Sequence, residues 1–305
     1  MVQIIIRMGT SSLEYQANID TTALELKSHI FKAKKIPLIQ QQLSVQKNPE
    51  ERKIILKDTD IIHDYISLMQ DNTLVVNFKN LGRQIEYQSL FYLEYLLPII
   101  TLPFFYILNY QKSNSYYVLI TILGLFHFLK REFETAFIHV YSYPSVPWAN
   151  AWRNLVHYWA LFGILFPIEI YYWRTMSSSY NMILLGILVA LFFIFELLNF
   201  YCHVKLRNLR YEIVDGQKIL TKKRKIPKGL FFDSIIAPNY TFEVLSWVSF
   251  TVISRSYVMV LFTGFSATIM YLWAKKKKSG LIKNNAFSDD EKNMLKKRYA
   301  IFPGI

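Results

Sequence analysis

The pattern of hydrophobic and polar positions divides the chain into two parts. In residues 1–87, short apolar runs alternate with polar ones, as in ordinary soluble sequence. From Ser89 onward, apolar runs of membrane-spanning length are separated by short polar breaks. The pattern predicts a small α+β domain at 1–80, followed by an α-helical polytopic membrane domain at 81–305.

The N-terminal pattern predicts strands at 2–7, 13–19, 42–46, 54–56 and 73–78. Thr21 or Thr22 is placed to cap a helix that runs to about Lys35 and stops before Pro37. The order β-β-α-β-β-β resembles the ubiquitin β-grasp, in which one helix packs on a sheet. No terminal Gly-Gly pair is present, so we expect a fused ubiquitin-like domain rather than a conjugating tag.

The remaining pattern predicts about six transmembrane helices, at 89–108, 116–138, 155–173, 180–202, 241–254 and 257–274. The last apolar stretch, Thr241–Ala274, measures about 50 Å as one helix at ~1.5 Å per residue, which exceeds the ~30 Å hydrocarbon core. It is therefore expected to hold two segments, broken around Ser254, Arg255 and Ser256.

Basic residues lie beside the predicted spans. The formal net charge is +13, and nine Lys or Arg residues fall in 203–240 and nine in 275–305. By the positive-inside rule these segments and both termini are cytosolic, and the weakly charged loops at 109–115 and 174–179 lie on the far side. Charge placed this way favours lipid or cofactor phosphates as the counter-charges and argues against a nucleic-acid partner.

Three polar groups interrupt or flank the apolar runs. One helical stripe consists of Asn199, His203, Arg207 and Arg210. The apolar run after Pro238 begins with Asn239, Tyr240 and Glu243. A third group is the i, i+4 pair of Lys130 and Glu134. Ionisable groups at membrane depth are costly, so their default interpretation is functional. Arginines are suited to bind phosphate, and a tyrosine hydroxyl beside charges can donate a proton.

Structural interpretations compete with each of these assignments. Positive-inside anchoring accounts for Arg207 and Arg210, but not for Asn199 and His203. A tyrosine at the interface is usually an aromatic-belt residue. Arg131 and Glu132 are interpreted as a snorkelling interfacial pair, whereas Glu134 lies deeper and either faces inward or joins them.

Several classes of site are excluded by absent motifs. Cys202 is the only cysteine, so thiolate-rich metal sites are excluded, and no clustered set of metal ligands is present, so no metal is expected. The ten glycines form neither a Gly-x-Gly-x-x-Gly motif nor a Walker loop. Any nucleotide is therefore expected to bind outside a Rossmann domain.

These residues resemble the very-long-chain trans-2-enoyl-CoA reductases of the endoplasmic reticulum, within the steroid 5α-reductase family. The matching segments run in order along the chain: Leu81-Gly82-x-Gln84-Ile85, Glu94-Tyr95, Lys130-Arg131-x-x-Glu134-Thr135-x-Phe137-x-His139, Asn199-Phe200-x-x-His203-x-x-Leu206-Arg207-x-Leu209-Arg210, Pro238-Asn239-Tyr240-Thr241-x-Glu243-x-x-Ser246-Trp247 and Trp273-Ala274-Lys275. The ubiquitin-like unit also matches this branch. After Lys275 the sequence departs from the family pattern, which leaves open whether the tail 276–305 takes part in cofactor binding.

The resemblance implies NADPH-dependent reduction of trans-2-enoyl-CoA to saturated acyl-CoA, the last step of very-long-chain fatty acid elongation. It implies catalytic roles for Tyr240, Glu134 and Lys130, with Tyr240 as the favoured acid. It implies that NADPH is bound by Asn199, His203, Arg207, Arg210, Asn239 and Glu243. The expected partners are the acyl-CoA substrate, the lipid bilayer and other elongation-cycle enzymes, and the expected location is the endoplasmic reticulum membrane, with several spans.

Three alternatives to this function remain. One is a steroid or polyprenol enone reductase of the same superfamily, which the ubiquitin-like domain argues against. Another is a non-catalytic membrane adaptor that displays this domain, which leaves Asn199, Glu134 and Glu243 unexplained. The third is a transporter, but its ionisable residues should line a path through the bilayer, whereas here they crowd the cytosolic half.

Overall fold

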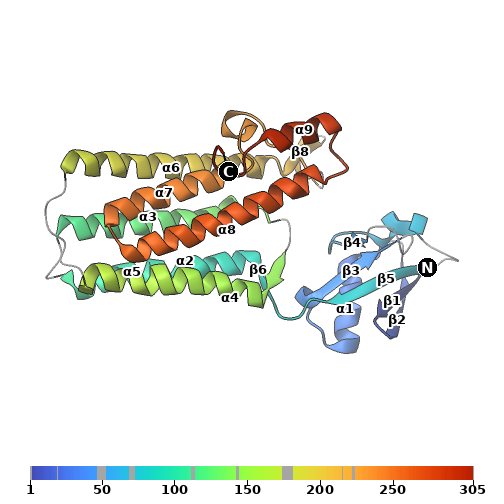
Figure 1. Ribbon diagram of the computed structural model, residues 1–305. Helices are drawn as coiled ribbons and strands as arrows, with labels where there is room; N and C mark the ends of the chain where they lie inside the picture. Colours follow the sequence, from blue (N-terminus) through green and yellow to red (C-terminus); the bar gives the residue numbers. More distant parts are fainter. Residues whose placement is uncertain are drawn as a thin grey trace. The chain divides into compact units, whose positions relative to one another are not determined.

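The computed structural model describes residues 2–18, 20–46, 53–68, 73–110, 114–141, 144–173, 181–214, 216–221 and 224–304. The chain forms two compact units, one of Met1–Tyr87 with Tyr143–Ala151 and one of Gln88–Ser142 with Trp152–Ile305. The first is rich in strands and the second is built from long helices (Figure 1).

The strand-rich unit forms a five-stranded sheet with one helix. Its elements are β1 Val2–Met8, β2 Ser11–Ala17, α1 Ala23–Lys34, η1 Leu38–Gln40, β3 Gln41–Val45, β4 Ile54–Ile55, η2 Ile62–Leu68 and β5 Thr73–Asn80. The strand order is β2-β1-β5-β3-β4, with β1 parallel to β5 and the other neighbours antiparallel. The predicted strands and helix are thus confirmed in type and order.

Alternation explains how this sheet builds its core. Ile4 and Ile6 on β1 are fully buried, and Leu26 and Ile30, one helical turn apart on α1, are buried with them. The Thr22 hydroxyl accepts a hydrogen bond from a backbone N–H in the first turn of α1, as the sequence predicts. A second, two-stranded sheet in this unit pairs β6 Gln84–Glu86 with β7 Ser145–Pro147.

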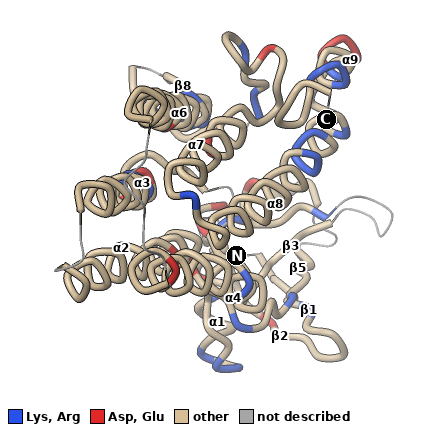
Figure 2. The backbone as a smooth tube through the Cα atoms, turned by 60° about the vertical axis from the view of Figure 1, so that its left-hand side comes forward, with Lys and Arg blue, Asp and Glu red and all other residues tan. Residues whose placement is uncertain are grey.

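The helical unit is a bundle. Its elements are α2 Tyr87–Leu108, α3 Ser115–Phe137, α4 Trp148–Val156, the π-helical η4 His157–Leu165, α5 Phe166–Ile168, the π-helical η5 Glu169–Trp173, α6 Met182–Asn208, β8 Tyr211–Val214, β9 Gln217–Leu220, η6 Leu230–Asp233, α7 Pro238–Ser254, α8 Tyr257–Ile282 and α9 Asp289–Lys297. Helix α7 contacts α3, α6 and α8, and Figure 2 shows it between them. The start of α7 is therefore surrounded by the helices that carry the predicted polar residues.

The predicted break in the last apolar stretch is confirmed. Helix α7 ends at Ser254, Arg255 has a left-handed backbone with φ of 49°, and the Ser256 hydroxyl caps α8. The carboxylate of Glu169 accepts hydrogen bonds from the Tyr257 N–H at 2.9 Å and the Val258 N–H at 3.0 Å, and from the Ser256 hydroxyl. A buried anion thus satisfies the first donors of α8.

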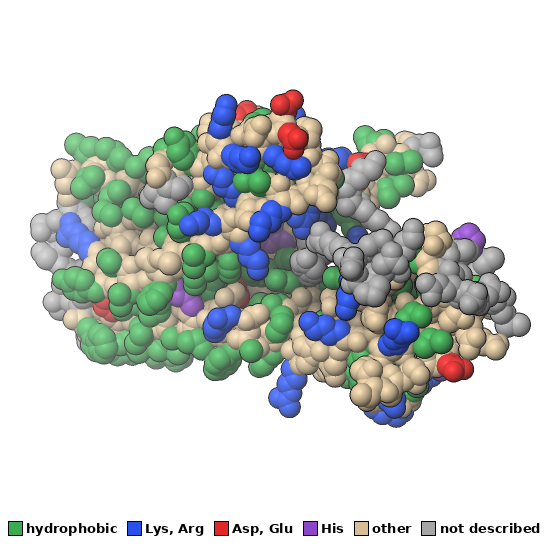
Figure 3. Space-filling view, turned by 45° about the vertical axis from the view of Figure 1, so that its right-hand side comes forward, with side chains coloured by type: hydrophobic (Ala, Val, Ile, Leu, Met, Phe, Trp, Pro, Cys, Tyr) green, Lys and Arg blue, Asp and Glu red, His purple; other side chains and the backbone are tan. Residues whose placement is uncertain are grey.

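Among the described residues, four helical segments are long and apolar enough to cross a membrane: Tyr87–Leu108, Trp148–Trp173, Met182–Asn208 and Tyr257–Ile282. The predicted count of six is not confirmed, because α7 has only 17 residues and α3 carries four charged residues near its end. Helix α6 exposes large apolar side chains, such as Ile183 and Leu197, that a bilayer would cover. Figure 3 shows apolar side chains over much of the helical unit and basic ones gathered toward one end.

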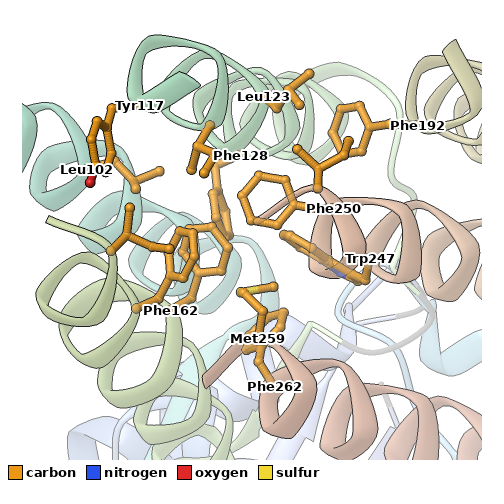
Figure 4. Close-up of a cluster of buried hydrophobic side chains, with 14 of the residues drawn as sticks. Leu102, Tyr117, Leu123, Phe128, Phe162, Phe192, Trp247, Phe250, Met259 and Phe262 are labelled. Atoms are coloured by element: carbon orange, nitrogen blue, oxygen red, sulfur yellow. The ribbon is translucent and has the colours of Figure 1, made fainter. Parts of the chain in front are cut away.

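Aromatic side chains fill the centre of the bundle (Figure 4). Phe128, Phe162, Phe250 and Phe262 are fully buried, and Trp247 packs edge-on against Phe250 with ring centroids 5.9 Å apart. The cluster draws residues from α2, α3, η4, α5, η5, α6, α7 and α8. Because each ring contacts several others, the helices are fixed in relative position by dense apolar packing.

Candidate active site

Polar side chains of α3, α6 and α7 meet in the interior of the helical unit. Glu134, Asn199, His203, Asn239 and Glu243 are all buried, with relative exposures between 0% and 6%. They belong to three segments far apart in the sequence, and the packing of α7 against α3 and α6 brings them together. Six of the nine predicted site residues, these five and Lys130, thus join one network.

Glu134 is paired with three cationic or ionisable side chains. Its Oε2 accepts a hydrogen bond from Arg131 at 2.7 Å and lies 3.1 Å from Nδ1 of His203. Its Oε1 lies 3.5 Å from Nζ of Lys130, which is the predicted i, i+4 pair. The inward position expected as one alternative for Glu134 is therefore the one found.

Lys130 is held by acceptors on two helices. Its ammonium lies 2.6 Å from Oε2 of Glu196 and donates to Oδ1 of Asn199 at 2.7 Å, in addition to its contact with Glu134. Nδ1 of His127 lies 2.7 Å from the other oxygen of Glu196. An ammonium has three donors, and here three acceptors face it, so the half-buried Lys130 is held as a counter-charge.

Asn199 connects α6 to the start of α7. Its Nδ2 donates to the backbone carbonyl of Asn239 at 2.8 Å and lies 3.5 Å from Oε2 of Glu243. The amide of Asn239 in turn lies 3.4 Å from Nε2 of His203. Through these contacts the polar stripe of α6 and the polar start of α7 form one structure.

Arg131 lies at the centre of the network, and its interpretation as a snorkelling interfacial residue is wrong. Its side chain is buried; besides Glu134 it donates to the Tyr95 hydroxyl at 2.9 Å and lies 4.0 Å from Glu243. A guanidinium offers five donors, and interior acceptors from α2, α3 and α7 hold it away from the surface. Glu132, by contrast, is half-buried.

Buried residues outside the predicted set also belong to the site. Glu94 and Tyr95 of α2, His127 of α3 and Glu196 of α6 are each 1% exposed. The Glu94-Tyr95 pair is one of the segments on which the sequence resemblance rests, and His127 and Glu196 interrupt apolar runs. An ionisable residue within an apolar run is thus the sequence signal that could have identified His127 and Glu196.

Tyr240 stands at the first turn of α7, beside this network. It is half-buried and packs against Ala237, Ala274 and Ile301, with its ring centroid 6.2 Å from that of Trp273. Asn239 and Glu243 on the same turns point into the network. The partial exposure leaves Tyr240 accessible to a bound molecule.

Arg207 lies in the last turn of α6, and Arg210 lies two residues after the helix ends at Asn208. Both are half-buried. The guanidinium of Arg207 has no hydrogen-bond or ion-pair partner within the described residues. An unpaired guanidinium beside a polar network, such as that of Arg207, is suited to bind phosphate.

Several buried polar atoms have no hydrogen-bond partner among the described residues. They include Oδ1 of Asn239, Nε of Arg131, Nε2 of His127 and Nε1 of Trp247. Buried polar atoms are normally satisfied, so these atoms are hydrogen-bonding positions that a ligand or water could use.

Glu134, His139 and His203 have ligand atoms within 4.8 Å of one another, a spacing that a metal ion could use. Arg131 donates to Glu134 and lies 3.4 Å from Nδ1 of His203, and Lys130 lies nearby. The charges of Arg131 and Lys130, both next to Glu134, would repel a metal cation bound at these three residues. Burial beside Arg131 and His203 lowers the pKa of His139 to about 2, so this imidazole is neutral.

Comparison with known proteins assigns the chain to a family. It is 30% identical to a very-long-chain enoyl-CoA reductase of Dictyostelium discoideum, over 85% of each chain. It is 34% identical to a provisionally named enoyl reductase of Schizosaccharomyces pombe, over 67% of this chain and 69% of the relative. It is also 34% identical to a provisionally named enoyl-CoA reductase of Trypanosoma brucei brucei, over 74% of this chain and 76% of the relative. Residues 144–305, more than half of the chain, match the family described as 3-oxo-5-alpha-steroid 4-dehydrogenase, and the chain belongs to that family.

Proposed function

We propose that this protein reduces trans-2-enoyl-CoA to saturated acyl-CoA with NADPH, the last step of the very-long-chain fatty acid elongation cycle. One observation carries the proposal. A buried network of Lys130, Glu134, Asn199 and Glu243 lies beside the half-buried Tyr240, in a chain related to enoyl-CoA reductases. Such a concentration of polar groups between apolar helices is costly to bury unless a ligand uses it.

NADPH would be held by the residues at the α6–α7 junction. Asn199, Asn239 and His203 would bind its polar head, Glu243 would orient these side chains, and Arg207 and Arg210 would bind its phosphates. The unsatisfied Oδ1 of Asn239 and the unpaired Arg207 support this fit. When bound, NADPH supplies the hydride that the β-carbon of the enoyl thioester accepts.

Tyr240 acts on the other half of the reaction. As the β-carbon gains hydride, negative charge develops on the thioester oxygen, and a proton must reach the α-carbon. The Tyr240 hydroxyl either donates a hydrogen bond to that oxygen or gives the proton to that carbon. A single donor of the first kind lowers a barrier by about 3–4 kcal/mol.

Lys130 and Glu134 support the reaction from within the network. The three acceptors around Lys130 hold its ammonium in place, and Glu134 carries Arg131 and His203. We infer that both residues set the field and geometry around the thioester rather than exchange protons with it. Charges fixed before the reaction stabilise developing charge without reorganisation.

The apolar surface and the basic segments of the protein fit an amphipathic acyl-CoA substrate in a membrane. Helices α2, α6 and α8 expose apolar side chains that would contact the acyl chain of the substrate and the lipid tails. The basic segments at 203–240 and 275–305 would bind the phosphates of CoA. We propose six spans in the endoplasmic reticulum membrane, with α3 and α7 added to the four long apolar segments and both termini cytosolic. Other enzymes of the elongation cycle are proposed as partners.

We further propose that residues 1–80 are a ubiquitin-like β-grasp domain and that 81–305 are the reductase domain. The sheet order β2-β1-β5-β3-β4 with a single helix supports this assignment. A steroid or polyprenol enone is the alternative substrate, which the description of the family favours, whereas a pure adaptor would not need the buried network.

The test is NADPH oxidation by the purified protein, followed with trans-2-enoyl-CoAs of graded length, a steroid enone and a polyprenol enone. We expect turnover with the enoyl-CoAs and formation of the saturated acyl-CoA by mass spectrometry. Turnover of only the steroid or polyprenol would replace the proposed substrate. NADPH binding without turnover of any of them would refute the proposed reaction, and no NADPH binding at all would favour the adaptor.

A further inference from the structure

The C-terminal residues Arg298–Phe302, here named the C-terminal strap, pair with the segment that leads into α7. The backbone hydrogen bonds are Tyr299 N–H to Ser234 O at 2.8 Å, Ile236 N–H to Tyr299 O at 2.9 Å and Ala237 N–H to Ala300 O at 3.2 Å. Figure 1 shows the chain end returning to α7. A segment some 60 residues downstream thus borders the first turn of α7.

Side chains fasten the strap at both ends. Arg298 is 3% exposed and donates to the Pro227 carbonyl at 2.8 Å, while Lys278 of α8 donates to the Arg298 carbonyl. At the other end, the Thr241 hydroxyl donates to the Ile301 carbonyl. A buried guanidinium requires a fixed acceptor, so Arg298 keeps the strap in register.

The start of α7 lacks its own cap. Ala237 precedes the helix and makes no side-chain cap hydrogen bond, and Pro238 follows it. The first donors of a helix need partners, and the geometry of an uncapped start is set by its surroundings. Here the surroundings are the strap, and Tyr240 packs on the small cluster of Ala237, Ala274, Ala300 and Ile301.

We propose that the C-terminal strap is a positioning element that holds the Tyr240 turn of α7 in its reactive place. The inference rests on the proposed function, because it takes Tyr240 as the reacting tyrosine. It assigns the divergent tail a role through Tyr240 rather than through contact with the cofactor. A small displacement of a reacting group lowers turnover by about 100-fold without a matching change in substrate binding.

Thr241 offers a matched pair of variants. Thr241→Val removes the hydroxyl that bonds to Ile301 and keeps the shape, whereas Thr241→Ser keeps the hydroxyl. We expect Thr241→Val to lower kcat about tenfold, with KM for the enoyl-CoA nearly unchanged, and Thr241→Ser to restore most of it. A merely structural role would lower the amount of folded protein but would leave kcat of the folded fraction intact.

Hydrogen exchange provides a readout that needs neither substrate nor NADPH. In Thr241→Val, and in a variant that ends at Arg298, the amides of Ile236 and Ala237 should exchange faster, while those in the middle of α6 stay protected. Unchanged exchange of the Ile236 and Ala237 amides in both variants would overturn the proposed role of the strap. Faster exchange with normal kcat would also overturn it, because the Tyr240 turn would then not depend on it.

The two hypotheses fail in different ways. If the unaltered protein turns over no enoyl-CoA, the proposed function fails, and the exchange of Ile236 and Ala237 alone decides whether the strap holds α7. If the unaltered protein is active and Thr241→Val matches it in both kcat and exchange, the strap fails and the proposed function stands.

Discussion

Glu169 and Glu134 are both buried carboxylates of the helical unit, yet their surroundings differ. Glu169 accepts hydrogen bonds from the Ser256 hydroxyl and from two backbone donors at the start of α8. These donors belong to one turn and would need partners in any folded state. The Glu169 site is therefore accounted for by local helix capping.

Glu134 contacts side chains of α3 and α6, and the network around it contains unsatisfied polar atoms. In this network, Oδ1 of Asn239 and Nε of Arg131 have no hydrogen-bond partner within the residues that the structure describes. The cost of such atoms is roughly 1–3 kcal/mol each, which the folded protein tolerates only when a ligand or water completes them. Burial of charge is thus common to both sites, and incomplete satisfaction distinguishes the one that we propose to be functional.

Removal of Lys130 should give the largest effect. In Lys130→Gln the carboxylates of Glu134 and Glu196 lose their shared cation, and unpairing a buried charge costs about 3–5 kcal/mol of stability. The midpoint of thermal unfolding in detergent should fall accordingly. The double variant Lys130→Gln/Glu196→Gln should recover part of the loss, and no recovery would contradict the role of Lys130 as a counter-charge.

Tyr240→Phe should abolish most turnover and leave the fold intact. Loss of one donor to the developing oxyanion lowers kcat by about 10²–10³-fold. NADPH affinity and the unfolding midpoint should stay near those of the unaltered protein, because the ring still packs on Ala237 and Ile301. Near-normal turnover in this variant would exclude Tyr240 as the acid or the oxyanion donor.

Glu169→Gln tests the other side of the comparison. The amide keeps one acceptor oxygen but cannot serve all three donors at the start of α8, so stability should fall by about 1–3 kcal/mol. NADPH binding by the folded fraction, measured by fluorescence titration, should be unaffected. A loss of NADPH affinity comparable with that of a variant in the Glu134 network would remove the distinction between the two sites.

Arg207→Gln should weaken NADPH binding about tenfold with little change in kcat, because one charge-assisted phosphate contact is lost. The effect should shrink at high salt, since salt screens partly exposed charges. Arg255, at the far end of α7, offers a matched control: Arg255→Gln removes an equal charge and should leave NADPH affinity unchanged. Equal losses in both variants would point to net charge rather than to a phosphate site.

The sequence predicted the order of strands and helix along the N-terminal segment and the α7–α8 break, because alternation and the length of an apolar run are local signals. It also predicted which helical stripes carry polar residues. It misplaced Arg131, because the choice between snorkelling and burial depends on whether acceptors such as Tyr95 and Glu243 lie opposite, and this is a property of packing. The strap was not predicted, since a pairing between Tyr299 and Ile235 leaves no periodic pattern.

The last prediction concerns the stability of the protein at acid pH. Burial holds the pKa of His139 at about 2 in the folded protein, against an unfolded value of about 6.5. As pH falls below about 6.5, the unfolded chain takes up a proton that the folded site refuses, so stability falls by at most about 1.4 kcal/mol per pH unit from this residue. His139→Gln should flatten the unfolding midpoint between pH 7 and 5 relative to the unaltered protein. Identical slopes of the unfolding midpoint against pH in the two proteins would mean that His139 accepts its proton within the folded protein. The neighbouring Arg131 and Lys130 oppose this protonation. A bound anion would then be needed to balance the charge of the network.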